Sequence, residues 1–383
     1  MRILVLVAAN PAKNPRPSRF IDFLKKTHNV TAMGIKSTAI TGVEVISYSA
    51  YKKRNFFQEL WLWVLALFKK WDKLIFTKNR REILTFLKKR EFDLIICHDL
   101  VLLPIVLQEK KGAKVLFDAR EFYPKQKTTN LRWRILFERF NDELCRKYIP
   151  LADKAITVSA GLKKLYQEYY GINCEVFYSL CHYYDLSPSV IEKEIKMIYH
   201  GSANSIREIE KTVAIIDTLP DGYCLDLMVI FEDRNYKKKI EKMVHLRQKK
   251  GKKIRIIPPV AFEEIIPFSN QYDIGIYAIP ASTQNLRYAM PNKFFEYIQA
   301  RMALAIFPHH EMEAFIQKYQ NGIVSQEQTS KSLAQAILSL DRQKIMQMKI
   351  KSHIAAKILN ATQNETKIQN FLRDLFLVRE STK

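Results

Sequence analysis

The chain is poor in glycine and lacks the glycine-rich fingerprints of common nucleotide-binding folds. Only 10 of its 383 residues are glycine, whereas glycine makes up about 7% of an average protein. Neither G-x-G-x-x-G nor G-x-x-x-x-G-K-[ST] occurs, so nothing in the sequence supports a dinucleotide-binding fingerprint or a P-loop ATPase. Any phosphate group bound by this chain must therefore be held by helix N-termini and basic side chains.

Paired cysteines and long apolar runs are also missing. The five cysteines are odd in number and form no C-x-x-C pair, which argues against a disulfide framework or a cysteine zinc site and favours a reducing, cytoplasmic compartment. The longest apolar run, residues 60–68, has nine residues, whereas a membrane span needs about 20. The first nine residues lack the charged leader and cleavage site of a signal peptide. We therefore expect no membrane-spanning segment.

Basic residues, in contrast, are abundant and unevenly placed. The formal charge is +23, and residues 1–90 contain 19 Lys/Arg against 5 Asp/Glu, which implies an anionic partner. Residues 55–76 combine three tryptophans with clustered lysines, a pattern that fits a helix lying in the interface of an anionic membrane. The alternative is a buried helix with basic flanks. No helix-turn-helix, zinc-finger or RRM signature occurs, so we expect no nucleic-acid partner.

Short β-branched runs alternate with helical stretches, which predicts an α/β protein with two Rossmann-like domains in tandem. The boundaries expected are 1–180 for the first domain, 181–195 for a linker, 196–345 for the second domain, and 346–383 for a helical tail that crosses back to the first. The expected strands are 3–8, 94–97, 115–117, 155–158 and 175–178, then 197–199, 225–230, 254–257, 274–277 and 304–307. One helical segment is expected within 55–90.

Ligands of open α/β sheets bind beyond the carboxyl ends of the strands, so two such domains facing across a cleft would share one site. Pro291 suits the first position of a helix. Asn292, Lys293 and Glu296 would then lie on one face near its N-terminus, where the dipole and ammonium can hold a diphosphate and the carboxylate can bind a pair of hydroxyl groups. Alternatively, Lys293 and Glu296 form a solvated ion pair.

The segment P-N-K-F-F-E-Y at 291–297 resembles the P-N-K-x-F-E-Y signature of GT-B fold glycosyltransferases, in the large retaining family of the group 1, or family four, type. The resemblance extends over nearly the whole chain and keeps the order of the family's motifs. Four further segments carry it: N-P-R-P-S-R at 14–19, D-A-R-E at 118–121, A-D-K-A-I-T-V-S at 152–159, and Y-H-G at 199–201 followed by Arg207.

The resemblance implies a set of site residues, all in the loops that follow strands. The donor, a nucleotide-diphosphate-sugar, would be bound by Gly201, Ser202, Arg207, Asn292, Lys293 and Glu296. The acceptor side would comprise Arg16, Arg19, His98, Asp99, Asp118, Arg120 and Glu121. The groups implied to act in catalysis are Arg207, Lys293 and Glu121.

The chemistry implied is sugar transfer with retention, without a metal or other cofactor. Together with the basic, aromatic segment, it leads us to expect a lipid-linked or surface-polysaccharide glycan as acceptor, and a cytoplasmic protein bound peripherally to the inner face of the membrane.

Two departures from the family pattern leave alternatives open. Ala289 stands where many relatives have a first glutamate. Arg301 follows Ala300 at a position where the family usually has a second small residue. A catalytically degenerate GT-B subunit, serving as partner or scaffold in a glycan-assembly complex, is therefore the main alternative. A GT-B epimerase acting on a nucleotide-sugar is a third option, although its own signature is absent.

Overall fold

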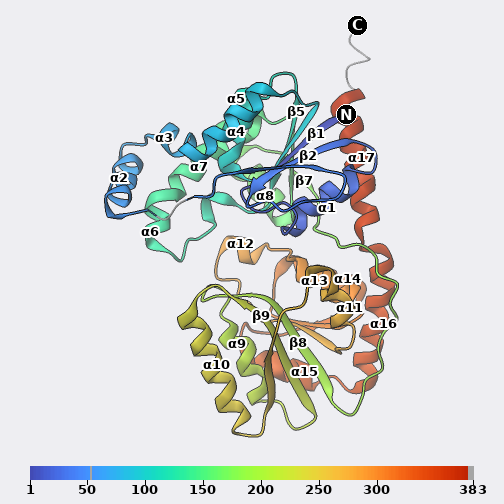
Figure 1. Cartoon of the computed structure of the whole chain (residues 1–383). Helices are drawn as coiled ribbons and strands as arrows, with labels where there is room; N and C mark the ends of the chain where they lie inside the picture. The colour runs from blue at the N-terminus through green and yellow to red at the C-terminus, as the bar shows by residue number, and fades with distance from the viewer. Residues whose placement is uncertain (52–53, 378–383) are drawn as a thin grey trace. The chain divides into compact units, whose positions relative to one another are not determined.

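A computed structural model describes residues 1–51 and 54–377. The contacts divide the protein into two compact units, each built around its own parallel sheet (Figure 1). Unit 1 comprises Met1–Ser179, Thr283–Asn285 and the chain from Asn364, and unit 2 comprises Leu180–Ser282 and Leu286–Gln363. Both sheets carry helices, and the chain ends in helical segments, so the predicted α/β class with two Rossmann-like domains and a helical tail is confirmed.

Unit 1 is organised around seven parallel strands in the order β3-β2-β1-β4-β5-β6-β7. The bounds are β1 Arg2–Leu6, β2 Asn29–Ile35, β3 Glu44–Tyr48, β4 Leu94–Cys97, β5 Lys114–Ala119, β6 Lys154–Thr157 and β7 Glu175–Val176. Strands 2 and 3 are added on one side of β1, and strands 4 to 7 on the other. The order therefore reverses between β1 and β4, and open sheets bind ligands beyond the carboxyl ends of strands at such a switch point.

The strands β2 and β3 are missing from the sequence-based prediction. Polar and small residues, such as Thr31, Gly34 and Ser47, interrupt these segments, so no continuous β-branched run stands out. In the structure β2 pairs with β1 through Ile3 opposite Val30. A Cβ at position 34 would lie 2.2 Å from the carbonyl oxygen of Ala9, so this strand passes the turn after β1 only because it has glycine there.

Helices cover the sheet of unit 1. Their bounds are α1 Pro15–Leu24, α2 Phe56–Leu67, α3 Trp71–Ile75, α4 Lys78–Lys89, α5 Leu103–Glu109, α6 Leu131–Trp133, α7 Arg139–Tyr148 and α8 Ala160–Tyr170. A π-helical turn, Arg134–Glu138, joins α6 to α7. The helical segment expected within 55–90 consists of three helices, because Lys69 adopts φ 50° and the chain turns before α3. Asn55 begins α2 with a capping box that Gln58 completes.

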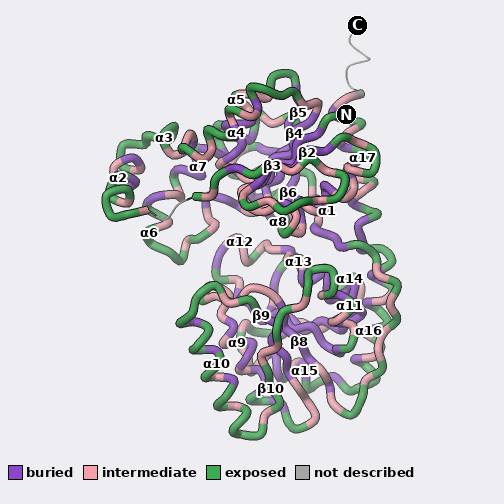
Figure 2. The backbone as a smooth tube through the Cα atoms, in the orientation of Figure 1, coloured by how far each residue is buried: buried purple, intermediate pink, exposed green. Residues whose placement is uncertain are grey.

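The core of unit 1 includes the end of the chain. Phe20 of α1 and Phe371 of α17 (Ala361–Leu377) belong to one buried cluster with Ile3, Ile96 and Ile156 of the sheet. Figure 2 shows the buried strands at the centre of each unit. Because α17 supplies part of this core, the C-terminal helix contributes directly to the stability of unit 1.

Unit 2 contains six parallel strands in the order β10-β9-β8-β11-β12-β13. The bounds are β8 Ile195–Ala203, β9 Tyr223–Phe231, β10 Lys253–Ile257, β11 Ile274–Tyr277, β12 Ala303–Ile306 and β13 Gly322–Val324. The order reverses between β8 and β11. β13 is absent from the sequence-based prediction, and residues 181–194, part of the expected linker, contain no helix or strand.

The helices of unit 2 follow its strands in alternation. Their bounds are α9 Ile209–Ala214, α10 Arg234–Gln248, α11 Ile265–Ser269, α13 Asn292–Gln299, α14 His310–Tyr319, α15 Ser330–Leu338 and α16 Arg342–Ile358. The short helix α12, Gln284–Arg287, has two residues in each unit. Pro291, expected at the first helical position of α13, is its N-cap, a shift of one residue within the usual spread of helix boundaries.

Arg301 has a structural function in unit 2. The residue lies after α13 with φ 61°, a left-handed conformation that costs an L-residue about 1–2 kcal/mol. Its buried guanidinium donates hydrogen bonds to the carbonyl oxygens of Leu186 (3.1 Å), Tyr184 (2.6 Å) and Gln299. These bonds tie the segment before β8 to α13. They explain why this chain has an arginine at a position where glycine would avoid the backbone strain.

Replacing Arg301 should therefore destabilise the fold. We expect Arg301→Ala to lower the free energy of unfolding by about 1–3 kcal/mol, because buried carbonyls lose their donors. Arg301→Gly should be less damaging than Arg301→Ala, because glycine accepts the positive φ. Urea unfolding measures both, with exposed Arg287→Ala as the control. Equal stability of all four proteins, wild type included, would show that Arg301 does not hold this segment.

Candidate functional site

The first candidate site lies at the switch point of unit 2. β8 and β11 are neighbours in the sheet, and α13 lies in the connection that leaves β11. The ring of Tyr297 in α13 packs on Gly275 of β11, where a Cβ would come within 2.5 Å of it, and its hydroxyl donates to the carbonyl oxygen of Ile276 (3.1 Å). Helix α13 is thus fixed against β11 through its second turn.

Two cations meet over a glycine at the carboxyl end of β8. Gly201 adopts φ 122°, and a Cβ at this position would lie 3.1 Å from Lys293 Nζ and 3.8 Å from Arg207 Nη1. Any other residue would be strained there and would crowd the Lys293 ammonium. The structure therefore brings together three of the predicted donor-binding residues, from β8, the turn after it and α13.

The Lys293 ammonium is buried without a hydrogen-bond partner among the described residues. It lies 3.8 Å from the ring centre of Tyr199 and 5.8 Å from that of Tyr277, where cation–π attraction offsets part of its desolvation. Burial, and then repulsion by Arg207, lower the pKa of Lys293 well below its usual range, against the opposing attraction of Glu296. An anion bound here would give the amine the partner it lacks.

Glu296 and His200 lie beside this pair of cations. Both are buried, and Glu296 Oε2 lies 3.6 Å from His200 Nε2. Burial, with a contribution from Lys293, lowers the pKa of His200 to about 3, so the imidazole is neutral at physiological pH. The site consequently contains one carboxylate next to two basic groups.

Ser202 and Asn292 complete the predicted donor set. Ser202 forms a hydrogen bond through its hydroxyl with Glu232, and its carbonyl oxygen accepts from Arg207 Nη1 (3.5 Å). Asn292 is the half-buried first residue of α13. Its N-cap, Pro291, has no side-chain acceptor, so the first backbone N–H groups of α13 have no side-chain cap, and such a helix N-terminus favours anions.

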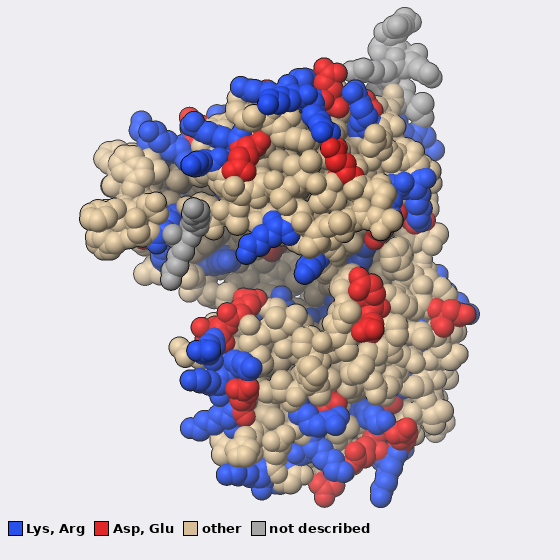
Figure 3. Space-filling model, in the orientation of Figure 1, with Lys and Arg blue, Asp and Glu red and all other residues tan. Residues whose placement is uncertain are grey.

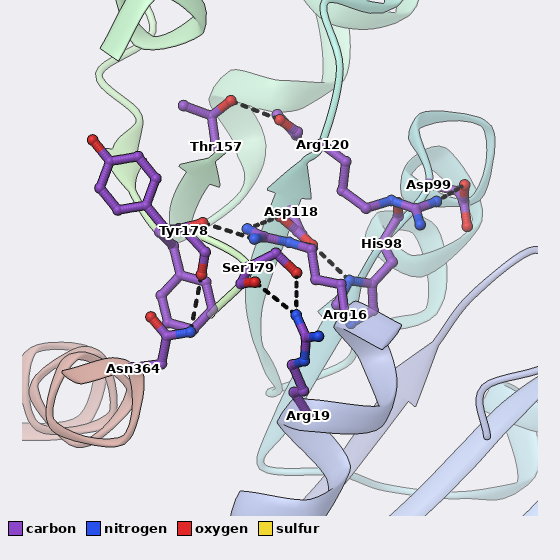
Figure 4. A network of polar contacts seen from close by, with 12 residues as sticks. Arg16, Arg19, His98, Asp99, Asp118, Arg120, Thr157, Tyr178, Ser179 and Asn364 are labelled. Atoms are coloured by element: carbon purple, nitrogen blue, oxygen red, sulfur yellow. Dashed lines mark hydrogen bonds and ion pairs between the residues drawn. The ribbon is translucent and has the colours of Figure 1, made fainter. Parts of the chain in front are cut away.

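The second candidate site lies at the switch point of unit 1 and consists of paired charges (Figure 4). Asp118 of β5 accepts two hydrogen bonds from Arg16 of α1, from Nε (2.6 Å) and Nη2 (2.7 Å). His98, directly after β4, lies 2.7 Å from the same carboxylate through Nδ1. All three side chains are buried. Elements that are distant in the sequence thus share one ion-pair network.

The electrostatics of this network fix its charge states. Burial raises the pKa of the Asp118 carboxyl, but the charge of Arg16 and the hydrogen bonds from His98 and Arg16 outweigh it, so the pKa lies below the ordinary value. Burial lowers the pKa of His98, and its bond to Asp118 opposes this. His98 is therefore neutral, and its buried Nε2 has no hydrogen-bond partner in the described parts of the chain.

The remaining predicted acceptor-side residues surround this network. Arg120 donates to Asp99 Oδ1 (2.7 Å) and to the carbonyl oxygen of His98 (3.0 Å). Arg19 donates to the carbonyl oxygen (2.7 Å) and hydroxyl (2.8 Å) of Ser179. Burial raises the pKa of Glu121. Six of the seven residues, all but Glu121, appear together in Figure 4.

Sequence analysis overlooked the groups that shape the Lys293 site. Tyr199, His200 and Tyr277 surround the ammonium, yet only the Y-H-G motif drew attention to the first two. Tyr277 could have been found from its place at the carboxyl end of a predicted strand. His309 contacts the carbonyl oxygens of Ile279 (2.6 Å) and Leu286 (3.0 Å) and holds the segment before α13 in place.

Comparisons with known proteins identify the fold. Neither the protein-family models nor the curated proteins searched match this chain. Among solved structures, HepE of Anabaena in complex with UDP aligns with a TM-score of 0.73 at 12% identity, over 98% of this chain and 100% of that one. Sucrose-phosphate synthase of Thermosynechococcus elongatus aligns with 0.72 at 12%, over 98% and 99%. The chain has the GT-B glycosyltransferase fold. A further GT-B match is the E. coli trehalose-6-phosphate structure bound with UDP-2-fluoro glucose, with 0.68 at 10%, over 98% and 99%.

The charge network of this GT-B chain makes a prediction about stability. Asp118→Asn leaves Arg16 buried without its counter-charge, which should cost about 3–5 kcal/mol of unfolding free energy. The control, Asp93→Asn, removes an exposed pair with Arg2 and should cost at most about 1 kcal/mol. Urea unfolding at pH 7 measures both variants.

The same pair predicts how stability depends on pH. Because the folded-state pKa of Asp118 is lowered, its contribution is complete above the ordinary aspartate pKa of about 3.9 and is lost as pH falls toward the folded value. Wild type should therefore lose more stability than Asp118→Asn between pH 5 and the acid limit of folding. Parallel pH profiles for the two proteins would contradict this.

Proposed function

We propose that this protein is a retaining glycosyltransferase that uses a nucleotide-diphosphate-sugar as donor. The observation that carries the proposal is the buried Lys293 ammonium, which meets Arg207 over Gly201 beside the N-terminus of α13. A diphosphate is the ligand whose charge fits this arrangement, because it can contact both cations and the uncapped N–H groups at once. Neighbouring structures that contain UDP support a nucleotide as the carrier of that diphosphate.

Each donor-side residue then has a defined role. Gly201 admits the diphosphate close to the backbone, with Ser202 and Asn292 at its edge. Arg207 and Lys293 neutralise it, and Glu296 accepts hydrogen bonds from the ribose hydroxyls. Because Lys293 is already buried and positioned before the reaction, it stabilises the departing diphosphate without reorganisation in the transition state.

The transfer step exchanges one bond for another. The bond from the sugar's anomeric carbon to the diphosphate oxygen breaks, and its electron pair leaves with the diphosphate. The acceptor's hydroxyl oxygen bonds to the same carbon, and its proton is taken up by the released diphosphate. We propose no covalent protein intermediate. Arg207 and Lys293 supply the charge stabilisation, with Glu121 as a further polar group on the acceptor side.

We further propose that the acceptor is a lipid-linked or surface-polysaccharide glycan at the inner face of the membrane. No described helix is both long enough and apolar enough to cross a bilayer. The supporting feature is α2, in which only Leu62 and Leu65 are buried, while Phe56, Phe57 and Leu67 are each 77% exposed. An exposed apolar helix flanked by lysines is suited to peripheral binding at an anionic surface. Residues 52 and 53, part of the basic flank, lie outside the described residues.

The donor assignment predicts binding and turnover. Wild type should release the nucleoside diphosphate from one member of a panel of UDP- and GDP-sugars. Lys293→Met should lower kcat by about 10²–10³, by analogy with the loss of one charge-stabilising donor, and Glu296→Ala should weaken binding of the nucleoside. Lys237→Met, which changes an exposed lysine of α10, is the matched control and should behave as wild type.

The outcomes separate the enzyme from its alternatives. If wild type neither binds nor turns over any nucleotide-sugar, the proposal is wrong. Binding without turnover in the presence of acceptor lipids would indicate the catalytically degenerate subunit that Ala289 leaves open. A product formed from the donor alone would indicate an epimerase.

The membrane assignment predicts salt-dependent binding to vesicles. Wild type should sediment with vesicles containing anionic lipid, and binding should fall as the salt concentration rises. Neutralising Lys69, Lys70 and Lys73 to Gln should weaken binding by about 1 kcal/mol for each charge. Equally strong binding to neutral vesicles would contradict the electrostatic part of this account.

A further inference from the structure

Unit 1 contains a cavity of about 860 Å³. Its lining residues come from α2, from the segment that follows α2, and from the helical stretch that comprises α6, the π-helical turn and α7. This volume is within the range of about 300–1,000 Å³ found for small-molecule sites. None of its lining residues is among the acceptor-side residues predicted from sequence except Asp99. The cavity is therefore a feature that the proposed donor chemistry does not use.

One side of the cavity is apolar. It is formed by Leu62 and Leu65, the only buried residues of α2, and by the aromatic side chains of Trp133, Phe137 and Phe140. The exposed Trp61 also lines the cavity, so this wall continues into the uncovered apolar surface of α2. Figure 3 shows that uncharged surface at the left edge of the molecule, with Lys and Arg side chains beside it.

The other side is cationic. Arg54, Lys73, Lys78 and Arg80 line the cavity together with two carboxylates. Both carboxylates are already engaged: Glu82 accepts from the backbone N–H of Ser49 (2.8 Å), and Asp99, as described above, pairs with Arg120.

Three of these four cations form no ion pair with any residue in the ranges that the structure describes: Lys73, Lys78 and Arg80, whereas Arg54 pairs with Glu59. Arg80 donates instead to the carbonyl oxygens of Leu74 (2.6 Å) and Ile75 (3.2 Å). The cavity thus has an excess of positive charge facing an apolar wall.

The cavity also extends to the predicted acceptor side. Asp99 and Tyr123 line it, and both contact the His98 network: Asp99 through Arg120 and Tyr123 through its hydroxyl, which donates to the carbonyl oxygen of His98 (3.4 Å). A ligand in the cavity would therefore have one end at the surface of α2 and the other at the carboxyl end of β4.

We propose that this cavity binds the lipid part of the acceptor, a lipid with an apolar chain that carries a phosphate or diphosphate. The chain lies against Leu62, Leu65 and Phe137, and the phosphate contacts Lys73, Lys78 and Arg80. This inference rests on the proposed function, because it names the class of acceptor for the same enzyme. Charge complementarity requires the anion, and the continuity of the apolar wall with the exposed face of α2 indicates a ligand delivered from a membrane.

The test uses farnesyl diphosphate as a short, soluble probe. Isothermal titration calorimetry and tryptophan fluorescence follow its binding to the full chain, because Trp61 and Trp133 line the cavity. We expect one site per chain. Farnesol and inorganic diphosphate should each bind at least about tenfold more weakly, since each offers only one of the two complementary parts.

Two pairs of substitutions separate the cavity from the general charge of this region. Lys73→Gln with Lys78→Gln should weaken farnesyl diphosphate binding about tenfold or more. Lys69→Gln with Lys70→Gln removes the same charge from positions that do not line the cavity and should leave it unchanged. Leu65→Trp should block the probe by filling the cavity, and the surface lysine variants keep the test valid if that variant does not fold.

Binding of UDP to each variant is measured in parallel, as a readout of unit 2. The proposal is overturned if farnesyl diphosphate does not bind, if the two lysine pairs have equal effects, or if farnesol or inorganic diphosphate binds as tightly as farnesyl diphosphate. If wild type binds UDP but not farnesyl diphosphate, this inference alone is overturned. Loss of UDP binding by wild type would instead overturn the proposed function, whatever the probe does.

Discussion

The account depends on a buried ammonium group that has no partner within the described chain. Lys293 lies over Gly201, faces Arg207 and is sheltered by two tyrosine rings. Keeping an amine in this place is unfavourable for the isolated protein, because burial and a neighbouring cation both oppose its charge. A site held in this state is prepared for an anion, since binding removes the penalty and leaves the favourable contacts. The glycine and the packing of Tyr297 on Gly275, which holds α13 against β11, both serve to keep that geometry.

The two switch points differ in how their charge is balanced. In unit 1, Arg16 and Asp118 neutralise each other and His98 is neutral, so that the charges of this network balance without a ligand. In unit 2, Arg207 and Lys293 together exceed the single carboxylate of Glu296. Both sheets offer their carboxyl-end positions for binding, and of these two networks the one in unit 2 leaves an excess of positive charge for a diphosphate to neutralise. The same fold thus supports a buried, charge-balanced network in one unit and an anion site in the other.

Much of this could be predicted from sequence, and the failures have physical causes. The α/β alternation predicted both sheets, because buried parallel strands such as β4 and β12 are short, continuous apolar runs. Strands β2 and β3 do not stand out because polar and small residues, such as Thr31, Gly34 and Ser47, interrupt their apolar residues. The break at Lys69 was missed because a positive φ in a lysine leaves no compositional signal. The spacing of Asn292, Lys293 and Glu296 indicated a shared helix face. The contact of Lys293 with Gly201 could not be predicted from spacing, since about 90 residues separate the two and only the sheet order brings them together.

The measurement that tests the central claim most directly is the uptake of protons when UDP binds. If the pKa of Lys293 is lowered in the free protein and a bound diphosphate restores the charged amine, binding must take up protons at pH values between the pKa of the free and of the bound state, which a pH series locates. Calorimetry in buffers of different ionisation enthalpy measures this directly. The account predicts net proton uptake by wild type and none by Lys293→Arg, in which the cation is always charged. UDP binding by wild type without proton uptake, or equally tight binding by Lys293→Met, would contradict it.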